Sequence, residues 1–189
     1  MNLPELLKRA YSEEITHDEL SEVVRMIVSD ENQDLHTLIQ ILGRAGSPKY
    51  REIVEPYLHN VGNPQLSALA VKVLCWSWGL VREYREHLLC FLRGVDWDGE
   101  DYVRLEAIST VGEYLREESD KELLQVIYNI FSDQRERPLI RAAAYRALCR
   151  SEKIEWRDIV PVPRLVDSST EIDQGVVERV ERKLGRRTR

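Results

Sequence analysis

Apolar residues recur along this chain in a frame that repeats at a fixed distance. Each frame consists of an apolar residue, an alanine four positions later, and another apolar residue four positions after the alanine. The three frames are Leu66-Ala70-Leu74, Val103-Ala107-Val111 and Ile140-Ala144-Leu148. Successive frames are 37 residues apart both times. Side chains at i, i+4 and i+8 lie along one stripe of an α-helix, so each frame predicts an amphipathic helix within a repeated unit.

The predicted unit is a helical hairpin, because a second apolar-periodic segment follows each frame after a short break. A weaker fourth copy of the frame precedes the others, with Leu38, Ile41 and Leu42 at its apolar positions and Asp34 at its first position. No segment alternates with the period of two expected of a β-strand. The pattern therefore predicts an all-α fold.

Proline at first helical positions and capping-box pairs mark where the helices begin. The proline signals are Ser47-Pro48, Asn63-Pro64 and Arg137-Pro138, and in the first two the residue before proline is a predicted N-cap. The capping-box pairs are Thr16 with Glu19 and Ser119 with Glu122. They predict helices over about 3–10, 17–29, 35–44, 48–61, 64–78, 82–95, 102–116, 120–132, 138–150 and 173–186. The stretch 154–175 is the least regular part, and the helix after it is expected to cover the end of the last repeat.

Two frames begin with the same signature, Val103-Arg104-Leu105-Glu106-Ala107 and Ile140-Arg141-Ala142-Ala143-Ala144. This apolar-Arg-x-x-Ala pattern resembles the HEAT repeat family, in particular the short bacterial HEAT-like repeats also found in phycobilin lyase subunits. The resemblance is firm over 101–150 and weaker over 34–95, where Ser67 and Leu35 replace the arginine. It implies a right-handed α-solenoid of about four HEAT-like helical hairpins, in which the second helices line the concave face.

The length of 189 residues predicts one folding unit. Within it we expect capping helices over 1–33, repeats over 34–150, and an irregular segment with a C-terminal capping helix over 151–189. The three cysteines, Cys75, Cys90 and Cys149, fall in predicted helix interiors without CxxC spacing, so we expect buried free thiols and a reducing compartment. No export signal or membrane span is apparent, which predicts a cytoplasmic protein.

The net charge of the chain indicates which kind of partner it can bind. With 27 basic and 33 acidic side chains the formal net charge is −6, which opposes nonspecific attraction to DNA or to an anionic membrane. A basic protein surface is a better match. The six basic residues against one acidic residue over 179–189 are explained by the helix macrodipole as well as by nucleic-acid contact.

Motifs for catalysis or metal binding are missing from the sequence. The four histidines have no paired spacing, and there is no GxSxG, P-loop, HExxH or dinucleotide motif. The turn Asp96-Trp97-Asp98-Gly99-Glu100-Asp101 has the acids of a calcium-loop start but not the later ligands. We therefore expect no enzyme activity, no cofactor and no metal.

The candidate partner-binding residues are acidic or aromatic and lie off the apolar stripes. They are Trp76, Asp96, Trp97, Asp98, Glu100, Glu52, Glu55, His59, Glu86 and Tyr128. In the 37-residue register Trp78 falls on a core position, whereas Trp76 falls on the positions of Glu113 and Arg150, which we predict to face solvent. Trp76 is expected either to contact a partner or to pack beneath a neighbouring loop.

These features favour a protein-binding module, most specifically an immunity or antitoxin-like protein that neutralises a basic, nuclease-like toxin. One alternative is an enzyme similar to the HEAT-like DNA glycosylases. Residues 63–150 argue against it, because they hold 12 basic and 14 acidic side chains where a DNA-binding face needs a basic excess. Another alternative is an assembly factor similar to the phycobilin lyase subunits. Fold resemblance alone cannot choose among these functions.

Overall fold

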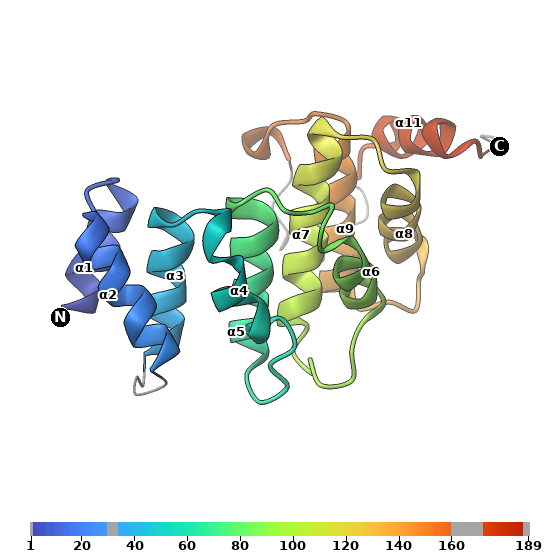
Figure 1. Cartoon of the computed structure of the whole chain (residues 1–189). Coiled ribbons are helices and arrows are strands. Elements are labelled where there is room, and N and C mark those ends of the chain that lie inside the picture. Colours follow the sequence, from blue (N-terminus) through green and yellow to red (C-terminus); the bar gives the residue numbers. More distant parts are fainter. Residues whose placement is uncertain (1, 30–33, 160–171, 187–189) are drawn as a thin grey trace. The chain divides into compact units, whose positions relative to one another are not determined.

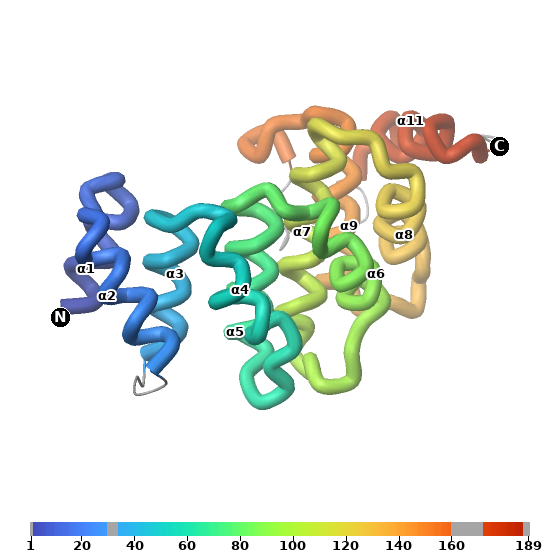
Figure 2. Tube along the Cα trace, in the orientation of Figure 1, coloured from blue at the N-terminus to red at the C-terminus, as the bar shows by residue number. Residues whose placement is uncertain are grey.

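The chain folds into helices and their connections over the residues that the computed structural model describes, namely 2–29, 34–159 and 172–186 (Figures 1 and 2). No β-strand occurs among these residues, as the lack of period-two alternation predicts. None of the helices in the described part of the chain is long and apolar enough to cross a membrane.

Packing divides the chain into two compact units. Unit 1 comprises Met1–Arg85 and Asp96–Glu106, and unit 2 comprises Glu86–Val95 and Ala107–Arg189. Unit 1 contains 17 acidic and 10 basic side chains, whereas unit 2 contains 16 acidic and 17 basic ones. The whole excess of negative charge in the sequence therefore belongs to unit 1, which carries a net charge of −7.

Unit 1 is built around α3 (Leu35–Ala45), whose residues Leu38, Ile39, Ile41 and Leu42 are fully buried. This helix packs against α1 (Leu3–Tyr11), α2 (His17–Val28), α5 (Pro64–Val71) and the turn that follows α5. Figure 1 shows α1, α2 and α3 side by side at the N-terminal end of the chain. Unit 1 thus has a helical core of its own.

The link between α1 and α2 is a capping box extended by an ion pair. Thr16 accepts a hydrogen bond from the amide of Glu19, and the Glu19 carboxylate accepts one from the amide of Thr16 at 2.9 Å. The same carboxylate pairs with Arg9 of α1. The capping box is the one that the Thr16 and Glu19 spacing predicts.

Two predicted helices of unit 1 are interrupted. The predicted helix 48–61 is divided into η1 (Pro48–Tyr50), α4 (Arg51–Val54) and η2 (Glu55–Tyr57). The α-helical hydrogen bonds end before η2 because Pro56 has no amide hydrogen to continue them. The predicted helix 64–78 changes after α5 into a π-helical turn, η3 (Lys72–Ser77). Neither interruption follows from apolar periodicity.

Unit 2 contains most of α6 (Arg85–Arg93), α7 (Tyr102–Glu117) from Ala107 onward, α8 (Lys121–Ser132), α9 (Pro138–Ser151), η4 (Trp156–Asp158) and α11 (Gln174–Leu184). Helices α8 and α9 form a hairpin, and α11 packs on both, as expected of a helix that covers the last hairpin. α7 and α9 approach closely at Gly112, where an added Cβ would lie 2.8 Å from the Cα of Ala147. Only glycine allows this separation.

The positions that repeat every 37 residues lie in the core. All nine residues of the three frames are at most 3% exposed, and Leu38, Ile41 and Leu42 of the weaker copy are fully buried. Trp78, which the register places in the core, is 9% exposed. The prediction that these positions face the helix packing is confirmed.

Two predicted helix caps do not form as expected, and one cysteine predicted to be buried is exposed. Asp120 caps α8 by accepting hydrogen bonds from the amides of the first turn, so the cap is one residue later than Ser119. Ser47 forms no capping hydrogen bond. Cys90 is exposed on α6, whereas burial raises the pKa of Cys75 to about 12 and that of Cys149 to about 11. All three thiols are free.

Candidate functional site

The structure brings together two of the segments that carry predicted partner-binding residues. Glu52 lies on α4, Glu55 begins η2 and His59 lies in the turn that follows η2, and all three are exposed. The His59 and Trp97 rings meet edge to face with centroids 6.4 Å apart. This contact places the turn 96–101 beside the end of the α4–η2 segment, inside unit 1.

The turn 96–101 is held by Asp98, which caps the start of α7. One oxygen of its carboxylate accepts hydrogen bonds from the amides of Val103 at 2.9 Å and Arg104 at 3.1 Å. Asp98 is only 4% exposed. The prediction that Asp98 lies on an exposed acidic surface was therefore wrong, because its charge satisfies the otherwise unbonded amides of the helix N-terminus.

We group the other predicted residues of these two segments, which the His59–Trp97 contact joins, under the name acidic surface. It consists of Glu52, Glu55, His59, Asp96, Trp97 and Glu100. Its four carboxylates are exposed, and Trp97 is partly exposed. Within the described part of the chain, Glu52, Asp96 and Glu100 form no ion pair. The acidic surface thus adds uncompensated negative charge to the more acidic unit.

Two predicted binding residues lie in unit 2. Glu86 is exposed on α6. Tyr128 is 6% exposed, donates a 2.5 Å hydrogen bond to Glu181 of α11, and lies beneath the Arg186 guanidinium at 4.3 Å. The expectation that Tyr128 is displayed for a partner was wrong, because α11 covers the face of α8 on which it lies.

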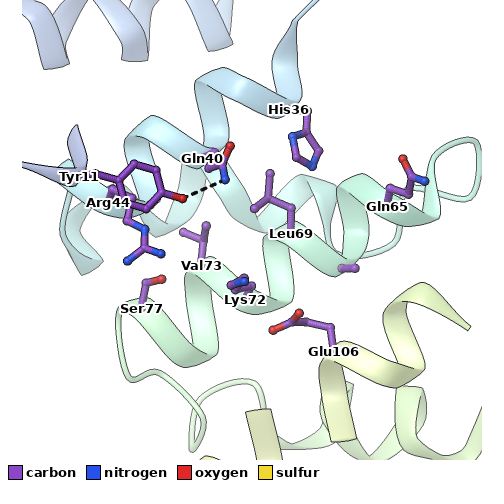
Figure 3. A pocket seen from close by; sticks show the side chains of 12 residues that line it. Tyr11, His36, Gln40, Arg44, Gln65, Leu69, Lys72, Val73, Ser77 and Glu106 are labelled. Atoms are coloured by element: carbon purple, nitrogen blue, oxygen red, sulfur yellow. Dashed lines mark hydrogen bonds between the residues drawn. The ribbon is translucent and has the colours of Figure 1, made fainter. Parts of the chain in front are cut away.

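Trp76 is 43% exposed in the π-helical turn η3, so it does not pack beneath a loop of the described residues. Trp76 lines a hollow that adjoins a pocket of about 230 Å³, and this pocket is shown in Figure 3. Arg44 of α3 and Lys72 of η3 line both this pocket and the adjoining hollow next to Trp76. Sequence reasoning missed these two cations, because their positions come together only through the packing of α3 on η3.

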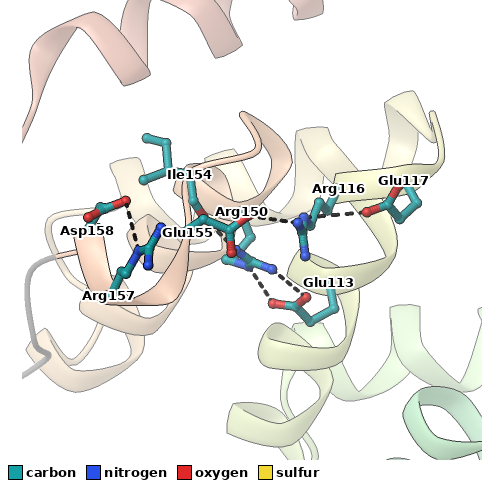
Figure 4. A network of polar contacts seen from close by, with 8 residues as sticks. All are labelled: Glu113, Arg116, Glu117, Arg150, Ile154, Glu155, Arg157 and Asp158. Carbon is teal, nitrogen blue, oxygen red and sulfur yellow. Dashed lines mark hydrogen bonds and ion pairs between the residues drawn. The ribbon is translucent and has the colours of Figure 1, made fainter.

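Glu113 and Arg150, predicted to face solvent, instead form a paired contact inside unit 2 (Figure 4). Arg150 is 2% exposed and donates to both oxygens of Glu113, at 2.5 and 2.8 Å. It also donates to the carbonyl of Ile154 at 2.6 Å, and Trp156 stacks on it. A buried arginine with these partners is a structural contact between α7 and α9.

Metal-ligating side chains do not cluster in the described residues. No three His, Cys, Asp or Glu side chains there are placed to hold a metal ion. Burial raises the pKa of Tyr145, and its hydroxyl accepts a hydrogen bond from the amide of Asp173 at 2.7 Å, so this group belongs to the core. Of the residues predicted from the sequence to bind a partner, the exposed ones that the structure brings together are those of the acidic surface.

Comparisons with protein-family models, with curated proteins and with solved structures found no match to this chain.

Proposed function

We propose that this chain is a HEAT-like helical-repeat protein that binds another protein and has no catalytic role. The architecture we propose is a right-handed α-solenoid of about four hairpins with capping helices at both ends. It is supported by the 37-residue register of buried frame positions. The pairing of Glu113 with Arg150 adds support, because these residues occupy equivalent positions of successive repeats.

The observation that carries the binding proposal is the acidic surface of unit 1. Exposed carboxylates attract and orient a basic partner, and an aromatic side chain among them supplies contact area with little conformational freedom to lose. Trp97 is such an aromatic side chain, and its ring packs edge to face on the His59 ring at a centroid distance of 6.4 Å. The partner is therefore a protein with a basic surface.

The most specific form of this proposal is an immunity or antitoxin-like protein that covers the active surface of a nuclease-like toxin. Such toxins bind a polyanion and so present basic clefts, which complement a unit with a net charge of −7. A DNA-binding or glycosylase-type function needs a basic face in the same place. An assembly factor would also act through protein contact, and the identity of the captured partner distinguishes it from an immunity protein.

The test is affinity capture from the lysate of the native host, followed by measurement of the dissociation constant with the purified partner. The informative variant is the double substitution Glu52→Gln with Asp96→Asn, which removes two charges from the acidic surface. The matched control is Glu13→Gln with Glu14→Gln, which removes two exposed charges from unit 1 on the α1–α2 connection.

We expect the acidic-surface variant to weaken binding of a basic partner at least tenfold, whereas the control variant leaves it within about twofold. Equal effects of the two variants would contradict the proposed site. Retention of duplex DNA at physiological salt without any captured protein would contradict the proposed function and favour the glycosylase-like alternative.

A further inference from the structure

A second surface of unit 1 has the opposite charge. Arg44 on α3 and Lys72 on η3 line one pocket, and neither forms an ion pair with any residue in the described part of the chain. Both side chains are exposed. Their positive charge is therefore available to an anionic ligand. We call this pocket and the adjoining hollow beside Trp76 the Arg44–Lys72 groove.

Aromatic rings flank the two cations. The Arg44 guanidinium lies 4.5 Å from the centre of the Tyr11 ring, and the Tyr11 hydroxyl accepts a hydrogen bond from Gln40 at 3.3 Å (Figure 3). Lys72 lies 6.0 Å from the centre of the Trp76 ring. Tyr11 is 53% and Trp76 43% exposed. Exposed rings beside oriented cations can bind apolar side chains that neighbour an acidic group.

The π-helical turn places Lys72, Trp76 and Ser77 on the side of the helix that faces the groove. The amide of Trp78 bonds to the carbonyl of Val73, five residues earlier, at 3.0 Å. In a turn with such i→i+5 bonds, residues four and five positions after Lys72 lie on its side of the helix. Trp76 and Ser77 occupy these positions and line the hollow together with Lys72.

The shape of the groove favours an extended ligand over a small molecule. The pocket of about 230 Å³ adjoins the hollow of about 490 Å³ beside Trp76, and Arg44 and Lys72 line both, so the groove is longer than a single compact pocket. Side-chain amides of Gln40 and Gln65 line it and can bond a peptide backbone. Glu106 lies on the wall beyond Lys72 (Figure 3), so a ligand carrying many negative charges is disfavoured there.

The geometry points to a binding site for an acidic peptide segment, in which a carboxylate lies between Arg44 and Lys72 and an adjacent apolar side chain packs on Trp76. This inference goes beyond the proposed function, because it concerns another surface and does not need the acidic surface to bind anything. The peptide can belong to the same partner or to a different protein.

The test uses an array of immobilised hexapeptides with a fixed central glutamate and varied flanking positions. A parallel array has glutamine at the centre. The full-length protein is applied to both arrays, and the best peptides are then measured in solution by fluorescence anisotropy. Inorganic phosphate and adenosine monophosphate serve as competitors, because a free phosphate is the other anion that an arginine and a lysine can bind.

We expect binding to glutamate peptides with apolar flanks, at least tenfold tighter than binding to their glutamine counterparts. Arg44→Gln should weaken this binding about tenfold, and Lys72→Gln and Trp76→Ala several-fold, with unchanged circular dichroism. The matched control is Lys49→Gln, because Lys49 is also exposed in unit 1 and lies 4.7 Å from the centre of a tyrosine ring. That substitution should have no effect.

Three results would overturn the inference. One is the absence of any glutamate peptide that binds better than its glutamine counterpart. Another is equal sensitivity of binding to Lys49→Gln and Lys72→Gln. The third is Arg44-dependent binding of phosphate without peptide binding. Substitution of Glu52 and Asp96 should not weaken peptide binding, so a failure here is distinguishable from a failure of the proposed function.

Discussion

At the scale of single residues, Asp98 was predicted to bind a partner, but in the structure it stabilises the start of α7. Its carboxylate accepts hydrogen bonds from two amides at the start of α7 and is nearly inaccessible to a partner. We expect Asp98→Ala to lower the free energy of unfolding by about 1–2 kcal/mol, because the loss of a capping side chain leaves those amides unbonded. Urea denaturation followed by circular dichroism measures this change.

Two further substitutions make that measurement specific. Asp98→Asn keeps an oxygen acceptor in place and should restore most of the lost stability. Asp96→Ala, two residues earlier on the exposed side of the same turn, should change stability by less than about 0.5 kcal/mol. A larger loss for Asp96→Ala than for Asp98→Ala would show that the capping assignment is incorrect.

Sequence patterns located the core residues but not all surface residues. The 37-residue register predicted that Ala107 and Ala144 are buried, because helical periodicity reports which side of a helix faces its neighbours. Tyr128 and Arg150 are off the apolar stripes and yet buried, since α11 covers one and η4 with Glu113 surrounds the other. Such burial depends on a later part of the chain, which periodicity within one helix does not report.

At the scale of helical elements, the α1–α2 connection should be sensitive to acid. The pKa of Glu19 is lowered from 4.5 to about 2, mainly by hydrogen bonds from Arg9 and then by those from Thr16. A carboxylate whose folded pKa lies below its unfolded value stabilises the fold above the unfolded pKa and loses this effect as the pH falls through the folded pKa. The stabilisation by Glu19 should therefore be complete above about pH 4.5 and vanish toward about pH 2.

The measurement is the urea midpoint of the wild type and of Glu19→Gln at several pH values. The wild type should be the more stable protein at neutral pH, and the difference should narrow as the pH falls below about 4.5. Glu13→Gln, in the exposed connection before α2, serves as the control and should show no such convergence. A difference that stays constant down to about pH 3 would contradict the assignment.

The packing of α9 gives a second prediction at this scale. Ala144 is fully buried, so Ala144→Asp would put a charge without a partner into a close helix contact and should destabilise the protein by several kcal/mol. Ala143, its neighbour on the same helix, is only partly buried, and Ala143→Asp should cost much less. Thermal unfolding of both variants tests the register, which would be incorrect if Ala144→Asp left stability unchanged.

Helix boundaries were largely predictable from the sequence, whereas the two irregular turns were not. Proline at first helical positions and the Thr16 cap located the starts of η1, α5, α9 and α2. Pro56 could have indicated the break in the 48–61 helix, since a proline inside a helix removes a hydrogen bond. The residues of the π-helical turn at Lys72–Ser77 keep the apolar spacing of an α-helix. The sequence therefore predicted neither this turn nor the Arg44–Lys72 groove.

At the scale of the whole molecule, the separation of charge between the two units determines how a partner should associate. Because unit 1 carries the net negative charge, long-range attraction should raise the association rate of a basic partner and fall steeply with added salt. Dissociation should depend instead on short-range contacts such as the Trp97 ring. The two kinds of residue on the acidic surface can therefore be separated kinetically.

Asp96→Lys and Trp97→Ala provide that separation. Asp96 is exposed and forms no ion pair among the described residues, so its charge reversal should mainly slow association and reduce the salt dependence of the rate. Trp97→Ala should cost about 2 kcal/mol of binding free energy, chiefly as faster dissociation, because truncation removes the aromatic contact area. Surface plasmon resonance with the captured partner resolves the two rates, and unfolding curves show whether either variant has lost stability. If both substitutions changed only the dissociation rate, at every salt concentration, the acidic surface would not steer the encounter, and the charge of unit 1 would have no part in the association step.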